Sequence, residues 1–200
     1  MATKTFYTQS GGFSSGACLD NSGYCSGRSS STAMVGGNSY ATSETAGDLT
    51  NKQFQLASGE TNVTSKPIEC RPAVAAWAAG TYAVTVNVTT ANMNLTLTEI
   101  HLCRVSSACG AVSTIGSLTG IARGLGSTGS VTHNVTGAAD TNGSTDKLMV
   151  LMVFSNAAMS GQSANAEVTI ATPIEEASEP TGAKPGTLVI RQAVMRATLH

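Results

Sequence analysis

Charge is scarce in this sequence, and so are long apolar runs. Charged residues make up 12% of the 200 residues, and the formal net charge is −1. Proteins hold a phosphate backbone with a strongly basic surface, which this chain lacks, so we expect no nucleic-acid partner. The longest apolar stretch, Leu148–Phe154, is well short of the ~20 residues that a membrane-spanning helix requires. We therefore expect no membrane span and no membrane partner.

The N-terminus also lacks the features of a secretion signal. Residues 1–10 contain no apolar run of the ~7–15 residues found in such signals. We expect the protein to be made and first folded in a cytoplasm.

Cysteines are few and odd in number. With five of them, at least one thiol stays unpaired unless it pairs between chains. In a reducing compartment the simplest expectation is five free thiols, some of them buried. The pairs Cys103–Cys109 and Cys18–Cys25 are each spaced to close a small hairpin, and a particle that matures outside a reducing cell would favour such bonds.

The clearest pattern in the chain is the alternation in residues 81–90. One parity holds the apolar residues Tyr82, Val84, Val86 and Val88, and the other holds mainly threonine and asparagine. A period of two is typical of a strand with one face on a core and the other in water.

Seven segments of the middle of the chain are predicted to be strands, and Gly- or Asn-containing turns separate them. Many short strands with no helical pattern between them predict an all-β fold, specifically an antiparallel β-sandwich or jelly roll over residues 66–171. The predicted strands are Glu69–Trp77, Thr81–Thr90, Asn94–Val105, Val112–Ser117, Ser130–Gly137, Lys147–Asn156 and Glu167–Ala171.

Finer features are predicted within these strands. Pro72 favours an edge position for the first of them, because proline cannot donate to a ladder. The apolar parity changes along the third strand, which predicts a bulge near Thr98 and Glu99. Lys147–Asn156 is apolar on both parities, so we expect a central strand that is covered on both faces. Trp77 is expected to pack over one end of the domain.

Both ends of the chain differ in composition from the middle. Residues 1–65 are rich in Gly, Ser, Thr and Asn with isolated aromatic residues, which predicts either an extended arm that anchors at intervals on another surface or plain disorder. Residues 172–186 read as an extended, proline-punctuated acidic linker. The apolar segment 187–200 could return to its own sheet or add a strand to a neighbour.

Motif matches in the sequence lack the structural context that their chemistry needs. Gly12–Gly16 fits G-x-S-x-G, and Gly124–Gly129 fits G-x-G-x-x-G, but neither sits between a predicted strand and a helix. The carboxylate pairs Asp140 with Asp146 and Glu175 with Glu176 lie in a loop and in the linker, with no framework for acid–base work. The chain is therefore predicted not to be an enzyme, with no catalytic residue and no cofactor.

One combination of residues has zinc-binding chemistry. His101 and Cys103 share a strand face, and Cys109 and His133 could complete a four-ligand set. No C-x-x-C or H-x₃-H spacing supports this set, so we predict no metal site.

Three stretches resemble β-rich virion proteins of tailed bacteriophages, such as capsid decoration or cement proteins. They are Trp77–Val105, Ile115–Gly120 and Val153–Asn156. The resemblance covers only the middle of the chain. It implies a jelly-roll-like or sandwich domain displayed on a phage particle, and it carries over no functional residue.

The leading hypothesis is a non-enzymatic structural protein of a phage virion that bridges and stabilises major capsid subunits through its arms. Its expected partners are the major capsid protein or other virion proteins, together with further copies of itself. The alternative is a carbohydrate- or receptor-binding β-module of a phage tail or head fibre. A third hypothesis is a pilus-like subunit in which residues 187–200 complete a neighbouring copy.

Overall fold

The computed structural model describes most of the chain, and its regular structure is almost all strand. The described residues are 2–12, 40–56, 62–65, 68–70, 77–92, 94–105, 112–139, 147–156 and 162–175. Within them the elements are strands apart from one short 3-10 helix, η1 (Ala46–Asp48). The predicted all-β class is confirmed.

The described residues contain twelve strands, which form one sheet in the order β10-β6-β12-β1-β2-β5-β11-β7-β8, with β3 added to β12, β4 to β11 and β9 to β7. All pairs are antiparallel except β2 with β5. The strands are β1 (Ala2–Gly12), β2 (Tyr40–Ser43), β3 (Lys52–Leu56), β4 (Asn62–Thr64), β5 (Ile68–Cys70), β6 (Gly80–Thr90), β7 (Leu95–Val105), β8 (Val112–Leu118), β9 (Arg123–Gly124), β10 (Gly129–Gly137), β11 (Lys147–Asn156) and β12 (Gln162–Ile174).

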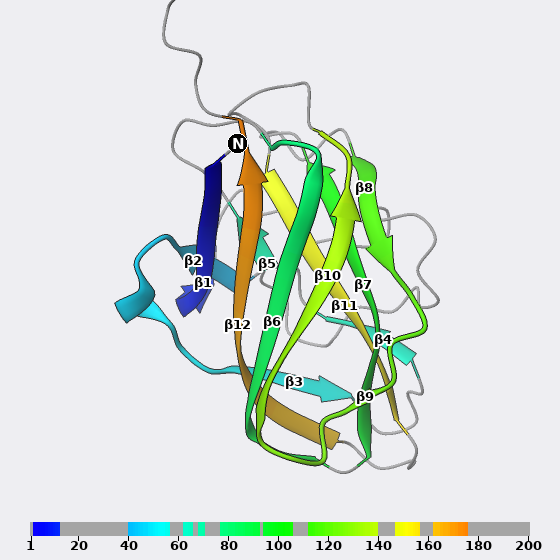
Figure 1. Cartoon of the computed structure of the whole chain (residues 1–200). Coiled ribbons are helices and arrows are strands. Elements are labelled where there is room, and N and C mark those ends of the chain that lie inside the picture. Colours follow the sequence, from blue (N-terminus) through cyan, green and yellow to red (C-terminus); the bar gives the residue numbers. More distant parts are fainter. Residues whose placement is uncertain are drawn as a thin grey trace, which may run out of the picture.

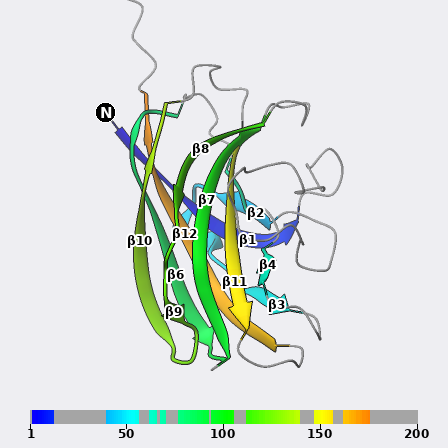
Figure 2. The same cartoon turned by 90° about the vertical axis from the view of Figure 1, so that its right-hand side faces the viewer.

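The sheet curls into a nearly closed barrel (Figures 1 and 2). Its two terminal strands, β8 and β10, meet where the Ala138 N–H donates to the Ile115 carbonyl over 2.7 Å. Figure 2 shows β10 and β6 on one side of the barrel and β7 and β11 on the other. The arrangement is a mixed, barrel-like sheet, and the predicted sandwich or jelly roll is not confirmed.

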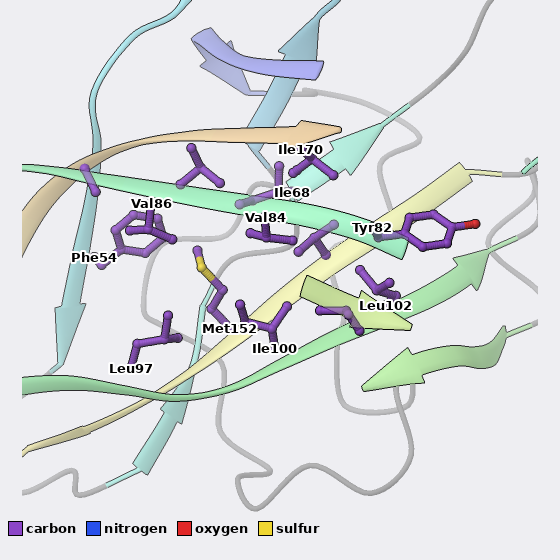
Figure 3. Packing of buried hydrophobic residues seen from close by; sticks show 14 of the residues in the cluster. Phe54, Ile68, Tyr82, Val84, Val86, Leu97, Ile100, Leu102, Met152 and Ile170 are labelled. Atoms are coloured by element: carbon purple, nitrogen blue, oxygen red, sulfur yellow. The ribbon is translucent and has the colours of Figure 1, made fainter. Parts of the chain in front are cut away.

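The barrel interior holds the main hydrophobic core. Tyr82, Val84, Val86 and Val88 of β6 are all buried there, as their alternation predicts. Figure 3 shows Val84 and Val86 opposite Ile100 and Met152, which come from β7 and β11. The core therefore joins the two sides of the barrel.

The N-terminal residues belong to this barrel, which makes the predicted arm over residues 1–65 wrong for the described parts of that range. β1 lies between β12 and β2, with Phe6 opposite Ile170. Phe6 is 1% exposed, and its ring centroid lies 5.6 Å from that of Trp77. Phe54 of β3 is also fully buried in the core. The remaining residues of the predicted arm lie outside the described ranges.

The C-terminal strand is longer than predicted. β12 continues to Ile174, and the buried hydroxyl of Thr172 donates to the Lys4 carbonyl over 3.2 Å. The predicted linker, 172–186, thus overlaps the end of a core strand, because Thr172 is held by backbone pairing with β1. Residues 176–200, including the predicted apolar segment 187–200, lie outside the described ranges.

Most strands of the middle zone agree with the prediction to within one residue. β5 lies between β2 and β11, so the predicted edge position is wrong for it, while Pro72 lies outside the described residues. The predicted bulge is confirmed at Thr98, since Val153 pairs with Glu99 and the next residue, Phe154, pairs with Leu97.

The central position of β11 is also confirmed. Its residues from Lys147 to Phe154 are all buried, and it pairs with β7 on one side and with β4 and β5 on the other. Trp77 is fully buried at one end of the barrel, where it forms an isolated bridge with Ile174.

Candidate interaction face

The outer surface of the barrel wall divides into a covered half and an open half. On the outer side of β7 and β11, Cys103, Val105, Met149 and Leu151 form a second apolar cluster that is fully buried. On the other side of the barrel, Figure 1 shows β12, β6 and β10 side by side with no described element in front of them.

The open half presents a set of short polar side chains that we call the threonine face. Strand alternation turns these side chains away from the core, and none of them is buried. The face consists of Thr3, Thr5 and Tyr7 of β1, Glu167, Thr169 and Ala171 of β12, Thr81, Ala83, Thr85 and Asn87 of β6, and Ser130, Thr132, Asn134 and Thr136 of β10.

Strand register arranges the face in rows. Tyr7, Thr169, Thr85 and Thr132 stand opposite one another in sequence across four strands. In the adjacent row Ala171 of β12 is directly opposite Ala83 of β6. The middle of the face therefore carries two alanine methyl groups, which are apolar and project little from the sheet. Residues with hydroxyl groups border them.

Two hydrogen bonds hold side chains of the face in place. The hydroxyl oxygens of Thr85 and Thr132 are 2.8 Å apart, and the Asn87 amide donates to the Glu167 carboxylate over 2.9 Å. Glu167 is the single charged side chain of the face. Short, β-branched threonine side chains have little rotamer freedom to lose, so ordering them against a partner costs little entropy. The face suits a neutral polar partner.

The hypothetical zinc ligands are not brought together. His101 is opposite Leu151 and lies on the covered outer half, whereas His133 is opposite Val84 and faces the barrel interior. Cys103 is disulfide-bonded, so its thiolate is not available to a metal. Cys109 lies outside the described ranges. Within the part of the chain that the structure describes, no three His, Cys, Asp or Glu side chains are grouped to hold a metal ion.

The disulfide also corrects the expectation of five free thiols. Cys103 is disulfide-bonded, while Cys70 is free and buried. Burial raises the pKa of the Cys70 thiol, which keeps it protonated and unreactive. The proposed pair Cys18–Cys25 lies outside the described residues.

The motif matches occupy unrelated places. Gly124 ends β9 and Gly129 begins β10, so a strand and not a helix follows the G-x-G-x-x-G match. Gly12 ends β1, and the rest of the G-x-S-x-G match lies outside the described residues. Glu175 is exposed beyond β12. Asp140, Asp146 and Glu176 are outside the described ranges.

A buried acid–base pair, which the sequence reading did not identify, lies on the covered half. His101 is fully buried, and its Nε2 lies 2.7 Å from a carboxylate oxygen of Glu99. Their i, i+2 spacing on one strand was a signal for this contact, since such residues share a face. The described residues define no ligand site beside this pair.

His133 gives the barrel a pH-dependent stability. Burial, and then the charge of Arg123, lower the pKa of His133 below its usual 6.5. The unfolded chain therefore binds more protons than the folded chain once the pH falls below about 6.5. The contribution of neutral His133 to the free energy of unfolding is fully present above that pH. It is lost as the pH falls toward the pKa of His133 in the folded state.

We expect the variant His133→Gln to lose less stability than the natural protein between pH 7.5 and 5.5. Urea unfolding midpoints at the two pH values measure this, and all other titrating groups are shared by both proteins. An equal loss in both proteins would contradict the assignment.

None of the helical residues in the described ranges forms a segment long and apolar enough to cross a membrane.

Comparison with known proteins yields limited similarity. No protein-family model matches the chain, and no curated protein matches it. A solved α-amino acid ester hydrolase is similar with a TM-score of 0.48 and 10% identity, over 86% of this chain and 36% of the hydrolase. An arabinose-bound α-L-arabinofuranosidase is similar with a TM-score of 0.36 and 12% identity, over 60% of this chain and 19% of that enzyme. Both scores are below 0.5, so neither likeness supports an argument about function.

Proposed function

We propose that this protein is a non-enzymatic structural protein of a bacteriophage particle. In this proposal it is a capsid decoration or cement protein with a jelly-roll-like domain, made in the host cytoplasm and displayed on the virion. The resemblance of Trp77–Val105 to phage virion proteins supports the class. The threonine face is the observation that carries the proposal, because it is a polar surface of four strands with a single charged side chain, and no described element lies in front of it.

The threonine face is better suited to contact with another protein than to catalysis. Most of its polar groups are hydroxyls and amides, two pairs of its side chains are held by cross-strand bonds, Thr85 with Thr132 and Asn87 with Glu167, and these groups suit contact with another protein surface. Because residues 2–12 belong to the barrel, we assign the contact with other virion proteins to this face and not to the start of the chain. The partners are the major capsid protein, other virion proteins and further copies of this chain.

The test uses particles of the phage that encodes the chain, with and without its gene. We expect mass spectrometry to find the protein in purified particles in a fixed ratio to the major capsid protein. Particles without it should release DNA at a lower temperature, and adding purified protein should restore the release temperature. Absence of the protein from purified particles would overturn the proposal.

Two variants tell whether the face makes the contact. Thr132 is exposed on β10 within the face, and Thr119 is exposed outside it, after β8. We expect Thr132→Arg to fail in restoring the release temperature and Thr119→Arg to succeed. If both variants restore it equally, attachment does not use the face.

A glycan-binding module is the second candidate, and a specific feature favours it. The paired amide and carboxylate of Asn87 and Glu167 lie beside the row that contains Tyr7. Sugar hydroxyls are bound by such planar polar groups, with an aromatic ring as a stacking surface. Binding of the purified protein on a glycan array, lost in Glu167→Gln and Tyr7→Ala, would favour this candidate. An array with no signal would remove it.

A further inference from the structure

Two basic side chains lie where the barrel closes, one on each side of the closure. Among the described strands β10 pairs only with β6, and its other edge is turned toward β8, which it meets at the bond from Ala138 to Ile115. β8 and β9 both pair with the edge of β7 that β11 leaves open. We call the boundary between β10 and these two strands the seam. Arg123 belongs to β9 and His133 to β10.

Strand register turns both side chains toward the barrel interior. Arg123 is opposite Leu97, and His133 is opposite Val84. Leu97 and Val84 are fully buried in the core, and residues that are directly opposite share one face of a sheet. Burying a charged group is costly unless a partner compensates for the lost water. Two basic groups on the inward side of the seam therefore call for an acidic partner.

The described residues supply no such partner. Arg123 is partly buried and forms no ion pair within the described part of the chain. β6, β8, β9, β10 and β11 contain no Asp or Glu. The acids of the neighbouring strands β7 and β12 are Glu99 and Glu167, which are opposite Val153 and Asn87 and point away from the interior. The guanidinium is thus available to an acid from outside the described chain.

His133 has an unsatisfied polar atom at the seam. Its Nε2 is shielded from solvent and has no hydrogen-bond partner. Buried polar atoms almost always have a partner, so an exception points to a missing ligand atom, water or ion. Burial, and then the charge of Arg123, lower the pKa of His133. Since the effect of a charge falls off within about 10 Å, the guanidinium lies near the ring.

The backbone that carries Arg123 is held in place on both sides of it. The Ile121 N–H donates to the Thr98 carbonyl over 2.9 Å, and the Leu125 N–H donates to the Leu95 carbonyl over 2.7 Å. Leu125 is fully buried. A site whose frame is fixed before the ligand arrives loses less entropy when the ligand binds.

We propose that Arg123 and His133 form a binding site for one carboxylate group. The Arg123 guanidinium donates two parallel hydrogen bonds to the carboxylate oxygens, which is the geometry in which arginine binds carboxylates best. The His133 ring, in the tautomer with its proton on Nε2, donates to one of the same oxygens. Arg123 supplies one positive charge and neutral His133 supplies none, so the site matches a monoanion. The inference goes beyond the proposed function and does not depend on it.

Apolar side chains beside the two basic groups define the rest of the ligand. Ile121 is partly buried and packs against the core, two residues before Arg123. Val131 is also partly buried, and it shares the inward face of β10 with His133, as its pairing with Val86 shows. The carboxylate is therefore expected on a short aliphatic stem. A free aliphatic acid and a glutamate side chain of another protein both have this chemistry.

NMR titration of the purified full chain with sodium butyrate tests the site. We expect the ring signals of His133 and the amide signals of residues 121–133 to shift, with a Kd of about 1 to 10 mM, since a single ion pair on a small ligand binds weakly. Arg123→Gln should weaken binding at least tenfold. Lys4→Gln makes the same charge change on β1, where Lys4 pairs with Glu44, and should leave binding unchanged. Butyramide, which has the same shape without the charge, should cause no shift.

The outcomes decide the proposal and the source of the ligand. No shift with butyrate, or equal binding by the natural protein and Arg123→Gln, overturns the site, and tighter binding of inorganic phosphate overturns its assignment to a carboxylate. A peptide with one glutamate and blocked ends that binds at least as tightly as butyrate assigns the site to an acidic side chain of another protein, and binding of butyrate alone assigns it to a free acid. Thermal unfolding checks that each variant is folded. If Arg123→Gln does not fold, Arg123→Lys replaces it, with an expected loss of about threefold because lysine lacks the planar fork.

Discussion

Replacing Phe6 with alanine is expected to lower the free energy of unfolding by about 3–5 kcal/mol, the usual cost of removing a buried aromatic side chain. Phe6 is 1% exposed and packs against Trp77 at a ring separation of 5.6 Å. The cavity would open between β1 and β12, where Phe6 is opposite Ile170. Urea unfolding followed by tryptophan fluorescence measures the change, since Trp77 is the only tryptophan.

Thr3→Ala is the matched control on the same strand. Thr3 is exposed on the opposite face of β1, so its loss should change stability by less than about 0.5 kcal/mol. If Phe6→Ala is as mild as Thr3→Ala, then β1 does not contribute to the core, and an N-terminal arm would again describe these residues.

Replacing Gly116 with alanine is expected to destabilise the protein by about 1–3 kcal/mol, the range seen when extra atoms are forced into a packed site. A Cβ at this position would lie 2.3 Å from the Thr136 carbonyl oxygen, closer than such atoms ever approach. The contact is with backbone, so β8 and β10 must separate. Their separation would also strain the hydrogen bond from Ala138 to Ile115.

Gly124→Ala is the control, because a Cβ at Gly124 would meet nothing within 4 Å. We expect this variant to unfold at nearly the same urea concentration as the natural protein. Hydrogen exchange should locate the effect of Gly116→Ala, with faster exchange of the Ala138 amide. Equal stability of the two variants would show that β8 and β10 do not depend on this close approach.

Local periodicity predicted the strands whose buried face is uniformly apolar. β6 and β11 were predicted in this way, and the parity change along β7 correctly located the bulge at Thr98. In these strands the side-chain pattern and the core agree residue by residue, so no knowledge of distant segments was needed.

β1 was not predicted as a strand because its inward face is partly polar. Thr8 points inward and is fully buried, yet its hydroxyl donates to the Thr50 carbonyl and accepts from the Val168 amide. Lys4 shares the parity of Phe6 and pairs with Glu44. Only contacts with residues far along the chain make these polar groups compatible with a strand, and composition cannot reveal such contacts.

The threonine face was predictable only in part. The outward residues of β6, such as Thr85 and Asn87, follow from alternation. Their alignment with Tyr7 and Thr169 depends on the register of β1, β12 and β10. Register is fixed by pairing between distant segments and by the shared core, so the rows of the face became visible only in the folded structure.

The pairing of β1 with β12 has a consequence for how the chain acquires its structure. Ala2 is opposite Ile174, and the bond between Thr172 and Lys4 joins residues 168 positions apart. During synthesis β1 lacks its neighbour on one side until β12 has emerged. Contacts this distant in sequence close slowly, over milliseconds to seconds in proteins of high contact order. The barrel can therefore be completed only after β12 has been synthesised, and until then one edge of β1 is open to other chains.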